Sequence, residues 1–141
     1  GAVERTGNVI TKVIPDIKTE NLIGAVKQIV GENAIMVSDE LIAYGQLNKN
    51  YKHVKVNHSK GEYVRELAHT NTIEGFWSQL KRQIVGIHHY VSPKHLQRYC
   101  NEAAFRYNFK KVEQDERFAS VVSNCEGSLK YSELTTNPMQ F

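Results

Sequence analysis

Residues 69–84, HTNTIEGFWSQLKRQI, combine a carboxylate, an aromatic ring and two cations in a short stretch. Glu74 precedes Lys81 by seven residues, and Trp77, the only tryptophan of the chain, lies between them. Seven residues are two turns of an α-helix, so Glu74 and Lys81 would share one helical face. Such a face could serve phosphodiester chemistry, with the acid binding a metal ion and the lysine binding a phosphate.

A second carboxylate is placed for the same chemistry. Asp39 ends the apolar run NAIMVSD, as expected of a strand that delivers a polar residue to the edge of a sheet. If the fold brings Asp39 and Glu74 together, their oxygens form a site for Mg²⁺ or Mn²⁺. Two such ions would stabilise the attacking and leaving oxygens of a phosphodiester displacement. The alternative is that Glu74 only complements the dipole at a helix start.

The charge distribution suggests an acidic polymer as partner. Residues 1–74 carry nine cations and nine acids, residues 75–111 carry seven and one, and residues 112–141 carry two and five. A basic block of this kind indicates either a nucleic-acid surface or an ordinary solvated helical surface. The candidate contacts to nucleic acid are Lys81, Arg82, Lys94, Arg98 and Arg106.

Composition indicates one globular domain. The chain has 141 residues, of which 40% are hydrophobic and 23% charged. It has no apolar run of membrane-spanning length and no secretory signal pattern, so we expect a soluble, intracellular protein without a membrane partner. Cys100 and Cys125 are expected to be reduced and structural. The histidines at 88, 89 and 95 could suggest zinc, but surface positions are favoured for them.

The elements that must position these residues are strands followed by helices. Residues 2–15 predict a hairpin around a turn at 6–8. Thr19 is a plausible N-cap for an apolar helical pattern that continues to Gly31. Residues 33–39 predict a buried strand, residues 40–47 a short helix, and residues 51–58 another strand.

Two long helices follow. On the first helix, apolar residues at spacings of four and three predict one stripe that faces the core, and Trp77 is expected to be its anchor. The residues of this stripe are Ile73, Trp77, Leu80, Ile84 and Ile87. Ser92 and Pro93 predict the start of the second. Its stripe is Leu96, Tyr99, Cys100, Ala103 and Tyr107, with both tyrosines expected in the core. The remainder, residues 112–141, is expected to be an acidic and less regular tail.

Four strings then carry a family resemblance. The segments that carry this resemblance are GAVER, VNHSKGEY, HTNTIEGFWSQLKR and HHYVSPKHLQRYCNEAAFRYN. The chain closely resembles the DDE transposase domain of the Merlin elements and related bacterial insertion sequences (the ISXO-like transposase domain). The resemblance covers residues 1 to about 110 in order. It implies an RNase H-like (retroviral integrase-like) α/β fold, a two-metal site and cut-and-paste DNA transposition.

Carried over by motif, the resemblance implies roles for three residues. Asp39 would be the second catalytic acid, Glu74 the third, and Lys81 the basic residue that follows it. His69 and Asn71 match further motif positions without an assigned role. Mg²⁺ or Mn²⁺ is the implied cofactor, and the implied partners are DNA at the element ends and target, with a possible homo-oligomer.

The sequence also departs from the family. The first catalytic aspartate of such transposases lies on the opening strand of the fold, ahead of the segment that GAVER resembles. We therefore expect an N-terminally truncated domain without its first strand, with residues 1–111 as a partial catalytic-type domain and 112–141 as a tail. Glu4 and Asp16 are expected to be surface charges.

Two functions remain open from the sequence. One is a transposase-derived domain with impaired DNA cleavage and strand transfer. The other is a non-catalytic DNA-binding or interaction module of the same descent. The expected compartment is the nucleus in a eukaryote and the cytoplasm in a bacterium.

Overall fold

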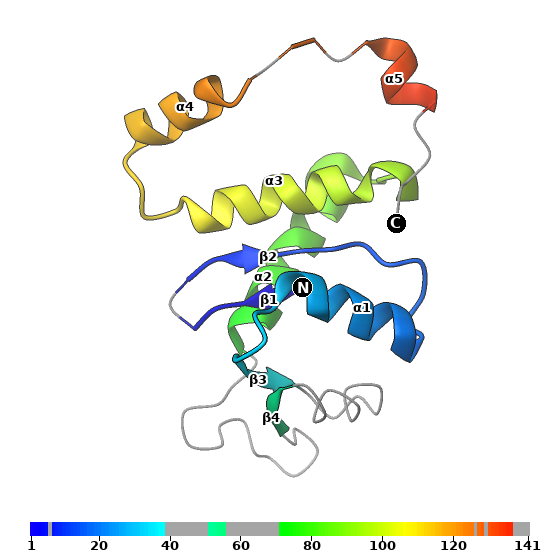
Figure 1. The fold of residues 1–141 in the computed structure, drawn as a ribbon. Helices are drawn as coiled ribbons and strands as arrows, with labels where there is room; N and C mark the ends of the chain where they lie inside the picture. The colour runs from blue at the N-terminus through cyan, green and yellow to red at the C-terminus, as the bar shows by residue number, and fades with distance from the viewer. Residues whose placement is uncertain (6, 39–50, 56–70, 126, 129, 137–141) are drawn as a thin grey trace.

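The structure is a computed structural model of the chain, and it describes all residues except 6, 39–50, 56–70, 126, 129 and 137–141. The described elements are mixed α/β (Figure 1). The strands are β1 (Ala2–Val3), β2 (Val9–Ile10), β3 (Ile35–Ser38) and β4 (Lys52–Lys55). The helices are α1 (Thr19–Ile29), α2 (Asn71–Gln83), α3 (Leu96–Asn108), α4 (Gln114–Ser123) and α5 (Tyr131–Thr136), with a π turn η3 (Ile84–His88) and a 3₁₀ turn η4 (Pro93–His95).

The predicted hairpin is confirmed. Strands β1 and β2 are antiparallel, with Ala2 opposite Ile10 and Val3 opposite Val9. The turn is closed by backbone hydrogen bonds, in which the Glu4 amide donates to the Asn8 carbonyl (3.1 Å) and the Gly7 amide to the Glu4 carbonyl (3.2 Å). The hairpin places the β-branched side chain of Val9 in the core, where it is 1% exposed.

Side-chain amides of α3 cover the outer edge of this hairpin. Asn108 accepts a hydrogen bond from the Val9 amide (2.7 Å) and donates one to the Val9 carbonyl (3.0 Å). Gln97 accepts from the Val13 amide (2.6 Å) and donates to the Thr11 carbonyl (3.1 Å). These amides satisfy backbone groups that a neighbouring strand would otherwise satisfy.

Helix α1 begins one position earlier than the capping pattern predicted. Thr19 is its first helical residue, and Lys18, which makes no side-chain capping bond, occupies the N-cap position. The prediction that Thr19 caps this helix was therefore wrong. Instead, the Asp16 carboxylate stabilises the start of the helix, where it accepts hydrogen bonds from the Lys18 amide (3.0 Å) and the Asn21 side chain (2.7 Å).

Strands β3 and β4 are parallel, with Met36 opposite His53 and Ser38 opposite Lys55. Both predicted strands are present, but β3 is only partly buried, since Ile35 is 67% exposed. The expected helix at 40–47 lies outside the described residues. Among the described strands, β1–β2 and β3–β4 form separate two-stranded sheets, so the single RNase H-like sheet stays a prediction.

Helices α2 and α3 build the core together with β2. Its buried residues are Val9, Phe76, Leu80, Cys100, Ala103 and Ala104. Phe76 is 2% exposed, whereas Trp77 packs partly buried against the cluster. Trp77 therefore packs on the core as predicted, but its neighbour Phe76 is the more deeply buried of the two rings. Ile87 is 70% exposed, since the helix changes to a π turn at Ile84 and the predicted stripe loses its register there.

The start of α3 follows the sequence pattern more closely. Ser92 is the N-cap and Pro93 lies at the first position, although they open the 3₁₀ turn η4, and Ser92 makes no side-chain capping bond. Tyr99 and Tyr107 are half-buried, and Tyr107 packs on the core cluster. The core prediction therefore holds for Tyr107, while the ring of Tyr99 lies against His88, with 4.7 Å between ring centroids.

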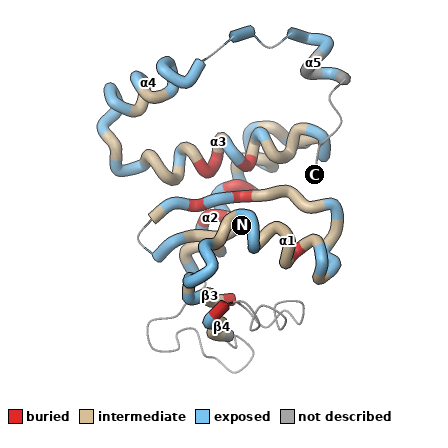
Figure 2. Tube along the Cα trace, viewed as in Figure 1, coloured by how far each residue is buried: buried red, intermediate tan, exposed pale blue. Residues whose placement is uncertain are grey.

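The segment after 112 is more regular than expected, because it contains α4 and α5. Figure 2 shows buried positions along β2, α2 and α3, while α4 is largely exposed. Phe118 of α4 is 70% exposed, and no residue of the described core cluster comes from α4 or α5. Within the described residues, no helix is long and apolar enough to cross a membrane.

Candidate active site

Glu74 lies in the first turn of α2, and its side chain is exposed. The partial positive charge at a helix N-terminus favours a carboxylate there. Lys81 lies in the last turn, also exposed, about 10 Å further along the axis. The two side chains thus share an exposed face of α2, on a helix that Phe76 and Leu80 anchor in the core.

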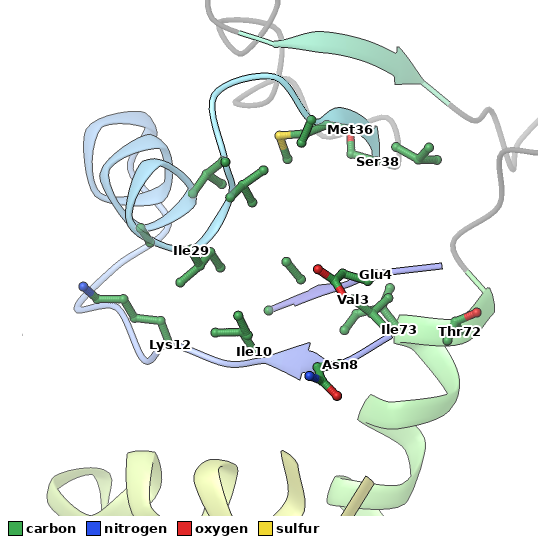
Figure 3. A pocket seen from close by; sticks show the side chains of 18 of the residues that line it. Val3, Glu4, Asn8, Ile10, Lys12, Ile29, Met36, Ser38, Thr72 and Ile73 are labelled. Carbon is green, nitrogen blue, oxygen red and sulfur yellow. The ribbon is translucent and has the colours of Figure 1, made fainter. Parts of the chain in front are cut away.

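The second candidate acid, Asp39, lies outside the described residues. Its predecessor Ser38 is buried at the end of β3, and Ser38 lines the same cavity as Ile73, the residue before Glu74 (Figure 3). The chain neighbours of both candidate acids therefore meet at one cavity. The proximity of the two carboxylates themselves stays a prediction.

A side-chain hydrogen bond ties the two strands together at this cavity. The Ser38 hydroxyl lies 2.7 Å from Nε2 of His53 on β4. Because Met36 is the residue opposite His53, this contact is diagonal across the strand pair. It fixes the end of β3 from which the chain continues to Asp39. Sequence reasoning passed over Ser38 and His53, since only the strand register reveals their pairing.

The remaining acids near the N-terminus separate into two cases. Asp16 belongs to the start of α1, where hydrogen bonds, chiefly that from Asn21, hold the pKa of its carboxyl below the usual value. Glu4 is exposed and lines the cavity that Ser38 and Ile73 also line (Figure 3). Glu4 is thus the only acid among the described residues that line this cavity.

The cations predicted for nucleic acid are all exposed: Lys81, Arg82, Lys94, Arg98 and Arg106. These side chains are not equally available to bind an anionic ligand. Arg106 forms a two-nitrogen hydrogen-bonded ion pair with Glu102 (2.9 and 2.8 Å), the only acid of residues 75–111. This pair lowers the contribution that Arg106 can make to an anionic ligand.

A groove of about 230 Å³ lies between α2 and α3 and was not anticipated. Gln79 and Gln83 line it from α2, and Arg106 lines it from α3 with Lys110 just beyond the end of that helix. The Lys110 ammonium lies 3.7 Å from the centroid of the Tyr107 ring, a cation–π geometry. Amide and cationic groups of this kind can contact phosphates.

The histidines do not form a metal centre in the described part of the chain. No group of three or more His, Cys, Asp or Glu side chains there could hold a metal ion. His88 instead packs against Tyr99, and His89 ends the π turn with a positive φ of 59°. A metal site at Glu74 therefore stays a prediction, since its proposed partner Asp39 lies outside the described residues.

Comparison with known proteins assigns this mixed α/β chain to a class. It is a transposase-type domain, since residues 1–108 match the family model of the ISXO2-like transposase domain. The chain belongs to this family.

A curated relative agrees with the assignment. It is an uncharacterised transposase-like protein of Haemophilus influenzae, 24% identical over 105 residues, which cover 74% of this chain and 84% of the relative. No solved structure gives a significant match.

Proposed function

We propose that this chain is a transposase-derived domain of the DDE type, related to the Merlin elements, with an RNase H-like fold. Its ancestral activity is metal-dependent cleavage and transfer of DNA strands in cut-and-paste transposition. The match of residues 1–108 to the ISXO2-like transposase domain carries this proposal. The exposed face shared by Glu74 and Lys81 supports the proposal, because the buried Phe76 holds α2 against the core and so fixes the position of that face.

The proposed metal ligands are Asp39 and Glu74. Carboxylate oxygens are the donors that Mg²⁺ and Mn²⁺ favour, so the chemistry of this donor pair fits the cofactor. The ions would stabilise charge on the attacking and leaving oxygens of the phosphodiester. Glu74 would bind from an exposed helix face, and Lys81 would bind a phosphate of the strand as a point charge two turns further along.

We propose that catalysis by residues 1–141 is impaired. In this scheme, the first acid of the triad belongs to a strand ahead of Gly1, and Asp39 and Glu74 leave one side of a two-metal cluster without its shared ligand. Glu4 is the first substitute to test, because it lines the cavity that Ser38 and Ile73, the chain neighbours of Asp39 and Glu74, also line.

A non-catalytic DNA-binding module is the second candidate. The observation that favours it is the exposure of Lys94 and Arg98, which need no metal to bind phosphates. In both cases the proposed partners are DNA, at the element ends and the target, and a second copy of this chain in a homo-oligomer. The proposed compartment is the nucleus in a eukaryotic host and the cytoplasm in a bacterial one.

A salt titration of duplex DNA binding tests the shared part of both candidates. We expect affinity at low salt that falls steeply as salt rises, because each neutralised phosphate releases counterions. Replacing Lys94, Arg98 and Arg106 together by Ala should flatten the slope of log K against log salt by roughly 2 to 3, given about 0.9 for each lost contact. The lower figure applies if Glu102 already neutralises Arg106.

The matched control removes the same net charge elsewhere. Lys18, Lys27 and Lys52 are exposed and lie outside residues 75–111, so their replacement by Ala should leave the slope nearly unchanged. Equal losses in the two triple variants would mean that overall charge, and not this surface, attracts DNA.

Strand cleavage with Mg²⁺ or Mn²⁺ separates the two candidates. The 141-residue chain is expected to be inactive. Activity should appear when an upstream strand carrying an aspartate is added, and Glu74→Gln should abolish it, while Glu20→Gln, in the first turn of α1, should not. Cleavage by the unextended chain that Asp39→Asn removes would contradict the impairment and make Glu4 the third ligand to test. No cleavage by the extended chain would favour the binding module.

A further inference from the structure

Helix α4 carries an exposed apolar stripe. Phe118 is 70% exposed, Val121 44% and Val122 55%, and Cys125, just beyond the end of the helix, is exposed as well. Positions three, four and seven residues apart lie on one side of a helix, so these side chains form a single face. Figure 2 shows α4 largely exposed, apart from the buried positions of β2, α2 and α3. Apolar anchors at these spacings are typical of a helix that docks in the groove of a partner.

The stripe is acidic at its N-terminal end. Asp115, in the first turn of α4, precedes Phe118 by three residues and Val122 by seven, so it lies on the same side of the helix. The stripe therefore combines a negative charge with an aromatic ring one turn away. A complementary surface needs an apolar hollow for the ring and a cation beside it.

The groove of about 230 Å³ between α2 and α3 has an apolar lining of this kind. Phe76 and Leu80 line it from α2, and the half-buried Tyr107 lines it from α3. The amides of Gln79 and Gln83 line it as well, and Gln79 is exposed. The groove thus offers aromatic and aliphatic carbon at its base and polar groups toward solvent, as a pocket for an aromatic anchor does.

The groove also provides the cation. Lys110 is exposed and lies over the ring of Tyr107. Within the described part of the chain, Lys110 is bound to no acid, whereas Arg106 is already paired with Glu102. Lys110 is therefore the lining cation that is more available to a carboxylate from outside.

The charge of the two surfaces favours a second copy of this chain as the occupant. Residues 75–111, which form the groove, carry seven cations and one acid, and residues 112–141, which include α4, carry two and five. The stripe is exposed here, so α4 does not fill the groove of its own chain. If the exchange is reciprocal, a two-fold symmetric pair contains the contact twice and closes, whereas a one-way contact builds an open chain.

From this complementarity we infer that α4 of each copy docks in the α2–α3 groove of a second copy and forms a two-fold symmetric dimer. Phe118 is the anchor on the apolar lining, and Asp115 pairs with Lys110 of the partner subunit. The family match of residues 1–108 does not extend to α4. The inference goes beyond the proposed DNA chemistry and specifies the surfaces of the proposed homo-oligomer. Because the contact forms by mass action, the dilute monomer lacks it.

Sedimentation velocity of the 141-residue chain without DNA provides the first test. We expect a reversible monomer–dimer equilibrium over about two decades of protein concentration. Phe118→Asp should raise the dissociation constant at least about tenfold, because an aromatic anchor in a pocket carries much of the binding free energy. Ile17→Asp is the matched control, since Ile17 is 77% exposed and lies outside both surfaces, and it should leave the dissociation constant unchanged.

A charge exchange separates a lost contact from a lost fold. Asp115→Lys and Lys110→Asp should each weaken the dimer, and the two changes in one chain should restore it, because the ion pair forms again with its polarity reversed. Asp115→Lys combined with Lys27→Asp is the control. Lys27 is exposed on α1, so this pair of changes restores the net charge without the contact and should not rescue the dimer.

Cross-linking shows whether the contact joins two chains. An isotope-labelled parent chain is mixed with an unlabelled Cys125→Ala chain that carries Gln79→Cys, and a short bismaleimide is added. We expect a product that joins Cys125 of the labelled copy to the thiol introduced at position 79 of the unlabelled one, identified by mass spectrometry. Glu20→Cys, on the exposed first turn of α1, replaces Gln79→Cys in the control and should give little of this product.

Three results would overturn the inference. A chain that stays monomeric, while Lys110→Asp lowers its affinity for duplex DNA, would assign the groove to DNA. A dimer that Phe118→Asp leaves intact would place the contact elsewhere. Cross-links confined to single chains that carry both Gln79→Cys and Cys125 would mean that α4 covers its own groove. The dimer and its cross-links are measured without DNA or metal, so the inference and the proposed function can fail separately.

Discussion

At the scale of single residues, the amide of Asn108 substitutes for a strand. It contacts both backbone polar groups of Val9, the most deeply buried residue of the hairpin. We predict that Asn108→Ala lowers the free energy of unfolding by about 1–3 kcal/mol, because it leaves a partly buried N–H and C=O without their partners. Urea denaturation measures this loss.

The control for this prediction is another asparagine. The Asn124 side chain is exposed and donates a hydrogen bond to the Ser120 carbonyl at the end of its own helix. Asn124→Ala should change the free energy of unfolding by no more than about 0.5 kcal/mol. A comparable loss in both variants would show that the bonds to Val9 contribute nothing of their own.

The thiol of Cys100 gives a prediction about pH. Burial raises the pKa of Cys100 above its ordinary value. The folded state therefore retains the thiol proton more strongly than the unfolded state does. This contribution to stability is fully present below about pH 8.5, the ordinary thiol value, and is lost as pH rises through the folded pKa.

Two cysteine variants isolate that contribution. In denaturation between pH 7 and 10, Cys100→Ala should show a shallower loss of stability with pH than the parent protein. Cys125 is exposed, so Cys125→Ala should keep the slope of the parent. Identical slopes in all three proteins would contradict the prediction.

At the scale of elements, α2 depends on one aromatic anchor. Phe76 contacts the rings of Trp77 and Tyr107 edge-on, with centroid distances of 5.1 and 5.7 Å. Phe76→Ala should lower the free energy of unfolding by about 3–5 kcal/mol through lost burial and a cavity between α2 and α3. Ile87→Ala, at a position 70% exposed, should cost less than about 0.5 kcal/mol. Chemical denaturation of both variants checks the ranking.

The elements also show which features periodicity can predict. Hairpin, helices and strands followed from alternation and from spacings of three and four, because these patterns are local. Phe76 and Trp77 are adjacent on the helix, so the apolar pattern alone could not decide which one points deeper. The π turn at Ile84 shifted the register, and this removed Ile87 from the stripe.

In the candidate site, too, local features could be predicted from the sequence and long-range contacts could not. Glu74 and Lys81 lie on one helix, so their shared face could be predicted from spacing. The contacts of Gln97 and Asn108 join residues 84 to 99 positions apart, and no local pattern reports them. The Ser38–His53 contact likewise depends on strand register. The pairing of Asp39 with Glu74 depends on residues outside the described ones and stays a prediction.

At the scale of the whole molecule, residues 112–141 add little to the described core. The cluster and the residues packed on it lie between Val3 and Tyr107. Removal of residues 112–141 should therefore leave the unfolding free energy of the remainder within about 1 kcal/mol of the full chain, apart from terminal fraying. A larger loss, measured in urea, would mean that α4 or α5 packs on the domain in solution.

The bond between Asn108 and Val9 also has a consequence for biosynthesis. Its two partners are separated by 99 residues, so α3 cannot complete the edge of the hairpin until nearly the whole domain has been translated. At about 5–20 residues per second, the hairpin waits roughly 5–20 s on the ribosome with that edge open. During this interval the unpaired edge of the nascent hairpin is open to pairing with strands of other nascent chains, which is the hazard against which chaperones act.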